Sequence, residues 1–208
     1  LLGGETAEIR DFSKSNGASV EDNKFDNRQH NYEMLGVIAG TIDQSRGNLY
    51  SKEDINVGDI LIGISSSGPH TNGYTLINEL LRQGRLQLDE ETFEQLTEYH
   101  VNYQPLVSEL LNYINIKGLA HITGGGFNDN VNRILPEYLN VAWFDWEWPD
   151  IFKKIQLASG LSDSEMYCTF NCGIGMVAIV SNDEFQNGKF DDYQGGLEIK
   201  MIGEVITI

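Results

Sequence analysis

One stretch limits the possible folds of this chain more than any other: a strand pattern that passes through small polar residues directly into a helix pattern. The strand pattern covers residues 59–64, and the turn after it covers residues 65–73. The following residues are apolar at the spacing of one helix face: Tyr74, Ile77, Leu80 and Leu81. The free N–H groups and the dipole of a helix's first turn attract anions. We therefore expect this turn to bind an anionic group, assisted by its hydroxyl groups and by His70.

A second turn repeats this arrangement. A short strand pattern at 118–122 leads into the sequence His121, Ile122, Thr123, Gly124, Gly125 and Gly126. A helix pattern with apolar residues at Val131, Ile134 and Leu135 comes next. We call residues 65–73 the serine turn and residues 121–126 the glycine turn. Each turn contains one histidine, and this pairing leaves a structural role and a role in catalysis or phosphate binding equally balanced.

The remaining patterns predict the fold class. Further helices are expected at 89–99, from Pro105, from Pro149, from a capping box of Ser162 and Glu165, and at 183–185. Further strands are expected at 140–145, 174–180 and 197–208. Strands and helices alternate, although not strictly. This predicts an α/β or α+β fold, with a mixed β-sheet packed against helices.

The chain is expected to contain two parts. Residues 11–31 are rich in Ser, Asn and Asp and predict a solvated loop, and residues 32–43 predict a strand. A boundary near residue 47 separates residues 1–47 from a domain at 48–208. The chain opens with Leu1, Leu2, Gly3 and Gly4, which look like the end of a buried strand. We therefore expect a portion of a longer protein.

The net charge of the chain argues against some classes of binding partner. The 208 residues include 14 Lys and Arg against 31 Asp and Glu, a net charge of −17. This balance argues against nucleic acid or an anionic membrane, but not against a phosphate bound locally at a helix start. No apolar run of about 18 residues and no signal peptide is present. Two cysteines form no disulfide framework and suit a reducing cytosol, so we expect a cytoplasmic protein.

Several other motifs favour a structural role over a role in binding or catalysis. Gly173 and Gly175 precede a strand rather than follow one, which argues against a nicotinamide cofactor, and no P-loop is present. Cys168 and Cys172 have no nearby histidine and are expected to be buried structural thiols. His30 and His100 are expected to be ordinary. Three tryptophans, at 143, 146 and 148, predict an aromatic cluster at the edge of the core or at an interface, rather than a ligand-stacking site.

Glu5 follows a tight glycine turn. Local chemistry favours a solvated acidic turn, with Mg²⁺ coordination by Glu5 as the alternative.

Four blocks in this order support a family assignment. They are Gly-Gly-Glu-Thr-Ala-Glu at 3–8, Ser-Ser-Gly-Pro-His-Thr-Asn-Gly-Tyr at 66–74, His-Ile-Thr-Gly-Gly-Gly at 121–126 and Thr-Phe-Asn-Cys-Gly-Ile-Gly-Met at 169–176. Together they resemble the phosphoribosylformylglycinamidine cyclo-ligase family, also called aminoimidazole ribonucleotide synthetases. The resemblance covers the whole chain and implies the C-terminal domain at 48–208 plus, at 1–47, the tail of an N-terminal ATP-binding and dimerisation domain. The N-terminal half is expected to be absent.

The resemblance implies an ATP-dependent ligase of purine biosynthesis. ATP activates the formyl oxygen of formylglycinamidine ribonucleotide, and an amidine nitrogen closes the ring to give aminoimidazole ribonucleotide. Such a reaction depends mainly on positioning and charge stabilisation. ATP and Mg²⁺ are the implied cofactors, and a homodimer through the N-terminal domain is the implied assembly.

The resemblance also assigns residues. The catalytic candidates are His70, His121 and Asn72. The substrate and phosphate candidates are Ser66, Ser67, Gly68, Thr71, Gly73, Thr123, Gly124, Gly125, Gly126 and Asn171. Gly4, Glu5 and Thr6 are expected near ATP, with Glu5 as the metal ligand.

Three departures from the family pattern keep alternatives open. Cys168 stands where the family has Arg, Gln104 where it has a basic residue, and Ile9-Arg10-Asp11 where it has Met-Pro-Gly. One alternative is another ATP-dependent enzyme of the same fold, such as a formylglycinamidine ribonucleotide synthetase-like protein. The other is a non-catalytic phosphate-binding or regulatory homologue.

Overall fold

The computed structural model describes residues 51–187, 190 and 196–208, and these belong to one compact unit that spans Asp43–Ile208. The predicted loop at 11–31, the predicted strand at 32–43 and the expected boundary near residue 47 lie outside the described residues.

The centre of the described unit is a five-stranded sheet with the order β2-β4-β1-β5-β3. The strands are β1 (Ile60–Ser65), β2 (Gly118–His121), β3 (Leu139–Trp143), β4 (Ile174–Val180) and β5 (Ile199–Thr207). Each pair of neighbours is antiparallel. The α+β class is therefore confirmed, but the expected mixed sheet is wrong in its strand directions. The sequence marks where strands lie, whereas their directions depend on which strands pair.

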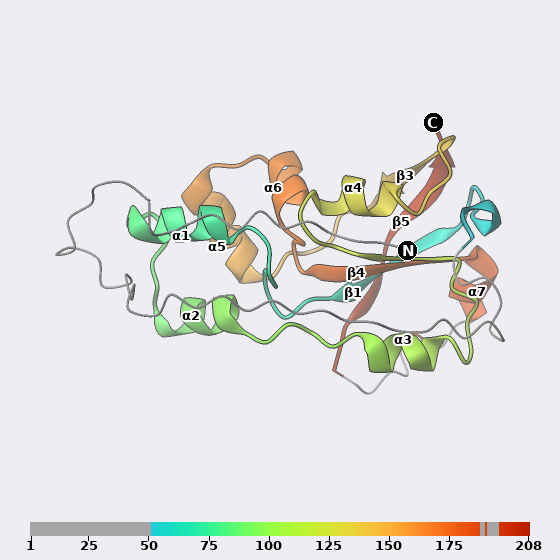
Figure 1. The fold of residues 1–208 in the computed structure, drawn as a ribbon, viewed down its shortest axis with the longest axis horizontal. Helices are drawn as coiled ribbons and strands as arrows, with labels where there is room; N and C mark the ends of the chain where they lie inside the picture. The colour runs from blue at the N-terminus through green and yellow to red at the C-terminus, as the bar shows by residue number, and fades with distance from the viewer. Residues whose placement is uncertain (1–50, 188–189, 191–195) are drawn as a thin grey trace, which may run out of the picture. The chain divides into compact units, whose positions relative to one another are not determined.

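Helices cover both faces of this sheet (Figure 1). They are α1 (Tyr74–Arg82), α2 (Glu90–Thr97), α3 (Gln104–Leu110), α4 (Gly126–Asn132), α5 (Asp150–Ser159), α6 (Asp163–Thr169) and α7 (Asn182–Asn187), with a short 3₁₀ helix at Lys52–Asp54. In Figure 1, α4 and α6 lie on one side of the sheet and α3 lies on the other.

The alternation of β1 explains these two layers. Leu61 belongs to the apolar core that includes residues of α1, α4, α5 and α6. Ile60, Ile62 and Ile64 point to the opposite face, where they meet the buried residues of α3. Because both faces of β1 are covered, nearly the whole strand is buried and reads as a continuous apolar run.

Capping residues fix two of the helix starts as predicted. The Asp89 carboxylate accepts a hydrogen bond of 2.8 Å from the Thr92 N–H at the start of α2. Ser162 and Glu165 form a reciprocal capping box at α6. The helix expected at 89–99 ends at Thr97, and of its apolar residues Leu96 is buried whereas Phe93 is exposed.

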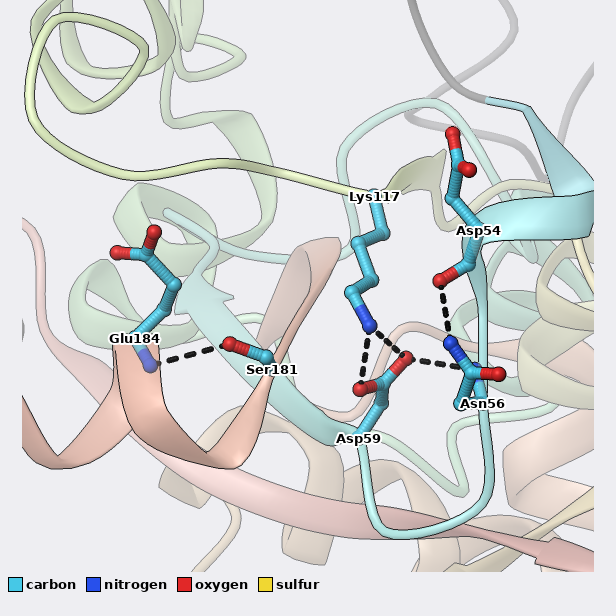
Figure 2. A network of polar contacts seen from close by, with 6 residues as sticks. All are labelled: Asp54, Asn56, Asp59, Lys117, Ser181 and Glu184. Carbon is cyan, nitrogen blue, oxygen red and sulfur yellow. Dashed lines mark hydrogen bonds and ion pairs between the residues drawn. The ribbon is translucent and has the colours of Figure 1, made fainter.

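A buried ion pair lies directly before the first residue of β1 (Figure 2). The Lys117 ammonium lies 2.7 and 2.8 Å from the two carboxylate oxygens of Asp59, and both side chains are largely buried. The Asn56 N–H also donates to the Asp59 carboxylate, at 2.8 Å. Lys117 directly precedes β2, so this pair links the starts of β1 and β2.

Candidate functional site

The sheet topology brings the two predicted turns to the same edge. β1 and β2 both pair antiparallel with β4, so they run in the same direction as each other. Ser65 is opposite Ile174 and His121 is opposite Met176, so both strands end beside the beginning of β4. The serine turn and the glycine turn therefore lie at the same edge of the sheet.

Short distances confirm that the turns meet. The ring centroids of His70 and His121 are 6.4 Å apart. An ideal Cβ atom placed on Gly124 would lie 3.6 Å from the Asn72 side-chain oxygen. Residues that are about 50 positions apart in the sequence thus share one surface.

The serine turn is held from inside by Asn171. This side chain is 2% exposed. Its amide nitrogen donates to the Gly68 carbonyl at 2.8 Å, while its oxygen accepts from the Gly173 N–H at 2.9 Å and from the Ser66 hydroxyl at 3.0 Å. Asn171 therefore fixes the shape of the turn, and its predicted contact with substrate stays a prediction.

The hydroxyl groups of the serine turn are not equivalent. Ser66 donates to Asn171, and Ser67 donates to the Tyr99 carbonyl at 2.6 Å. Both hydroxyl hydrogens are therefore engaged within the protein. Thr71 is exposed and Asn72 is half-buried at the surface of the turn.

Gly73 is the N-cap residue of α1. Its φ of 81° is in the left-handed region, and a Cβ atom there would overlap the ring of Phe170. No side chain caps α1, and its first turn contains no acidic residue. No acidic side chain of the first turn therefore compensates the positive end of the α1 dipole.

The glycine turn is held by a residue of its own helix. Asn130 is buried and donates from its amide nitrogen to the Gly126 carbonyl at 2.7 Å and to the Thr123 carbonyl at 3.3 Å. The Thr123 hydroxyl lies 3.2 Å from the Asn130 oxygen. Sequence reasoning missed Asn130, because an asparagine inside a helix pattern gives no sign of whether it faces the core.

Charge also distinguishes the glycine turn. Gly125 is the N-cap residue of α4, and Asp129 lies in the first turn of that helix. An ideal Cβ atom on Gly125 would lie 2.5 Å from a carboxylate oxygen of Asp129, so this carboxylate lies against the start of α4. A negative side chain at this position compensates the helix dipole and opposes a second anion.

A third histidine, His100, lies beside the two predicted histidines of the turns. The His70 ring stacks on the His100 ring with 3.9 Å between centroids, and His100 Nε2 lies 3.2 Å from His121 Nε2. The expectation that His100 is ordinary is therefore wrong. It belongs to the loop between α2 and α3, and only tertiary packing brings it to the other two rings.

The environment of the cluster favours the neutral forms of His70 and His121. Burial, with the neighbouring His100 and His121, lowers the pKa of His70 to about 4. Partial burial and His100 also lower the pKa of His121. His70 has a φ of 57°, a left-handed conformation that costs a non-glycine residue about 1–2 kcal/mol.

Tyr103 packs beside this cluster. Its ring centroid lies 6.0 Å from that of His70, and its hydroxyl donates to the Ser65 carbonyl at 2.9 Å. Burial raises the pKa of Tyr103, so the phenol stays protonated and holds the end of β1.

The tryptophans form the expected aromatic cluster at the edge of the core. Trp148 is buried and donates to the Tyr167 hydroxyl at 3.1 Å, while Trp146 donates to the Cys172 carbonyl at 3.0 Å. The cluster borders a pocket of about 320 Å³ whose lining includes Phe127, Trp143 and Tyr167.

The two cysteines differ in their exposure to solvent. Cys172 is buried, as expected, and burial raises the pKa of its thiol. Cys168 is exposed, so the expectation of two buried thiols is wrong for this residue. It lies near the end of α6, on the solvent side of the helix.

Two further findings concern only the part of the chain that the structure describes. The candidate metal-binding group found there consists of His70, His100 and His121. No helix among these residues has the length and apolar character needed to span a membrane.

Comparisons with known proteins point to one family. Residues 56–207 match the family model of the AIR synthase related protein, C-terminal domain. The chain is 39% identical over 192 residues to a phosphoribosylformylglycinamidine cyclo-ligase of Lawsonia intracellularis, covering 88% of this chain and 50% of the relative. It is 35% identical over 216 residues to a chloroplastic/mitochondrial cyclo-ligase of Vigna unguiculata, covering 100% of this chain and 51% of the relative.

A solved structure has a related fold. The hydrogenase maturation protein HypE of E. coli superposes with a TM-score of 0.52 at 20% identity, over 76% of this chain and 47% of HypE. This chain spans about half the length of the curated relatives described above.

Proposed function

Because this chain belongs to the AIR synthase related family, whose C-terminal domain it contains, we propose that it is part of a phosphoribosylformylglycinamidine cyclo-ligase. The complete enzyme would convert formylglycinamidine ribonucleotide to aminoimidazole ribonucleotide with ATP, in purine biosynthesis. The N-terminal half of such an enzyme would supply the remainder of the active site.

The meeting of the serine and glycine turns at one sheet edge is the observation that carries this proposal. These two turns belong to family motifs that are far apart in the sequence, yet β4 aligns the strands that precede them. A substrate with a phosphate at one end and a reacting amidine at the other needs two groups of contacts at a fixed separation. The paired turns offer such an arrangement.

The serine turn is the better candidate for the ribose phosphate. The start of α1 has no acidic residue in its first turn, whereas Asp129 lies against the start of α4. The hydroxyl hydrogens of Ser66 and Ser67 are engaged elsewhere, so backbone N–H groups and the exposed Thr71 hydroxyl would make the contacts. The net charge of −17 does not prevent this, because helix-start contacts act locally.

His121 and Asn72 would act on the reacting end of the substrate. His121 is exposed at the glycine turn, and the Asn72 side-chain oxygen faces Gly124. Ring closure releases a proton from the attacking nitrogen, and the neutral imidazole of His121 would accept that proton. Buried His70 would help to position the exposed rings through its stacking on His100.

ATP and Mg²⁺ remain proposals. The residues expected near them, Gly4, Glu5 and Thr6, lie outside the described residues. The histidine cluster does not fit Mg²⁺, which prefers oxygen ligands. The chemistry assigned to this chain therefore involves its own side chains alone. The cytoplasmic location and the homodimer are proposed from the resemblance.

The direct test is an assay of the chain together with the N-terminal half that the proposal implies. The coding sequence upstream would be expressed with this chain, and ATP-dependent formation of aminoimidazole ribonucleotide would be measured, with reactions that lack ATP or substrate as controls. We expect turnover that requires both. Substrate binding without turnover would favour the non-catalytic alternative, which the exposed Cys168 in place of the family's Arg motivates. Activity on another formylglycinamide substrate would favour the synthetase-like alternative.

A further inference from the structure

The three histidines between the turns come from three separate elements. His70 follows β1, His100 lies between α2 and α3, and His121 ends β2. One ring nitrogen from each lies within 4.8 Å of the other two. Nitrogens of the two exposed rings lie close together, with 3.2 Å between His100 Nε2 and His121 Nε2. Three imidazole rings from separate elements thus lie against one another.

One nitrogen in this cluster has no partner. His70 is 8% exposed, and its Nδ1 atom is buried without a hydrogen bond within the described part of the chain. Its Nε2 atom receives only a long contact of 3.4 Å from the Ser67 N–H. An unsatisfied buried polar atom costs about 1–3 kcal/mol, so its presence beside two other imidazoles points to a missing ligand.

We infer that His70, His100 and His121 form a binding site for a divalent transition metal ion of the Zn²⁺ class. Three imidazole nitrogens are a known ligand set for Zn²⁺, with a fourth position left open. Nitrogens around a tetrahedral Zn²⁺ with bonds of about 2.0–2.1 Å lie about 3.3 Å apart. The His100–His121 pair already has this separation, whereas the His70 nitrogen must close by no more than roughly 1.5 Å and its ring must turn out of its stack on His100.

The chemistry of the ligands selects the kind of metal. Mg²⁺ and Ca²⁺ prefer oxygen ligands, whereas imidazole suits Zn²⁺, Co²⁺ and Ni²⁺. The exposed sides of His100 and His121 leave the fourth position facing solvent. The metal site does not rest on the proposed cyclisation, because it uses only the geometry of the three rings. If both proposals hold, a metal ion and the substrate nucleotide would compete for the imidazole of His121.

Co²⁺ is a direct probe of this site, because tetrahedral Co²⁺ has a visible absorption band. The 208-residue chain would be treated with a chelator and titrated with CoCl₂, and Zn²⁺ would then be added to displace the Co²⁺. The experiment would use a Cys168→Ser background, so that the exposed thiol cannot bind metal. We expect one Co²⁺ per chain, with a tetrahedral spectrum that Zn²⁺ abolishes.

Variants identify the ligands. His100 is exposed, so His100→Ala should fold normally, and circular dichroism would check this. We expect this variant and His121→Ala to lower Co²⁺ affinity at least about tenfold. His30→Ala, which removes the remaining histidine of the chain, should bind as the parent does. Absence of a tetrahedral spectrum, full binding by folded His100→Ala, or an equal loss in His30→Ala would overturn the inference.

Discussion

The serine turn and the glycine turn follow the same pattern, strand then turn then helix, yet they are built differently. Asn171 holds the serine turn from a segment about 100 residues away, whereas Asn130 holds the glycine turn from its own helix. The start of α1 has no acidic residue in its first turn, whereas Asp129 lies against the start of α4.

From this difference we propose that the two turns serve different tasks. A helix start attracts an anion only when no carboxylate already compensates its dipole. We therefore assign the phosphate to the serine turn and the reacting end of the substrate to the glycine turn. The variants below test this division, beginning with the largest expected effect.

Gly126→Ala should damage the glycine turn most severely. Gly126 has a φ of 68°, and a Cβ atom there would overlap the backbone carbonyl of Tyr167. Overpacking against backbone adds to the cost of the left-handed conformation, so we expect a loss of about 3 kcal/mol in the free energy of unfolding. Gly84 has the same φ but open space around it, so Gly84→Ala should cost only about 1 kcal/mol. Urea denaturation would compare them, and equal losses would contradict the close packing of Gly126.

Asn171→Ala should destabilise the chain more than Asn130→Ala. Both changes leave buried backbone groups unsatisfied, which costs about 1–3 kcal/mol for each change. Alanine recovers roughly 0.5 kcal/mol at position 130 because that position is helical, whereas position 171 lies outside a helix. We expect losses of about 2–3 and 1–2 kcal/mol, measured by the same denaturation. The reverse order would show that the local support of the glycine turn is the stronger one.

His121→Ala should lower turnover in the complete enzyme by at least about tenfold, equivalent to about 1.4 kcal/mol, the low end of acid–base contributions. The steady-state rate of aminoimidazole ribonucleotide formation would be measured at saturating substrate. Asn140→Ala, an exposed change on β3, provides a control for general effects of substitution. Unchanged turnover would remove His121 from the reaction.

Asp129→Asn should have the smallest effect. The phosphate is assigned to the serine turn, so removing the carboxylate at α4 should change KM for formylglycinamidine ribonucleotide by less than about twofold. A several-fold fall in KM would instead mean that the substrate phosphate binds at the glycine turn, where Asp129 opposes it.

Much of the fold could be predicted because it depends on local patterns. The apolar run of β1, the helical spacing of α1 and the capping box at Ser162 each predicted an element that the structure contains. The resemblance named His70 and His121 as catalytic candidates; the structure brings them to one surface, and their roles stay predictions.

Features that depend on long-range packing could not be predicted. The antiparallel sheet follows from the pairing of strands, which no single strand specifies. His100 lies in a loop without a motif, and it reaches the cluster only because the loop between α2 and α3 passes the ends of β1 and β2. The bridging role of Asn171 likewise requires two segments to be in contact before it can be recognised.

Amide chemical shifts would test the central claim, that the two turns form one site with the phosphate at the serine turn. The labelled chain would be titrated with formylglycinamidine ribonucleotide and with its dephosphorylated riboside. The account predicts that the ribonucleotide shifts amides of residues 65–76 and 121–126 together. It also predicts that loss of the phosphate reduces the shifts at 65–76 much more than those at 121–126. Shifts confined to one turn, or equal reductions at both, would contradict it.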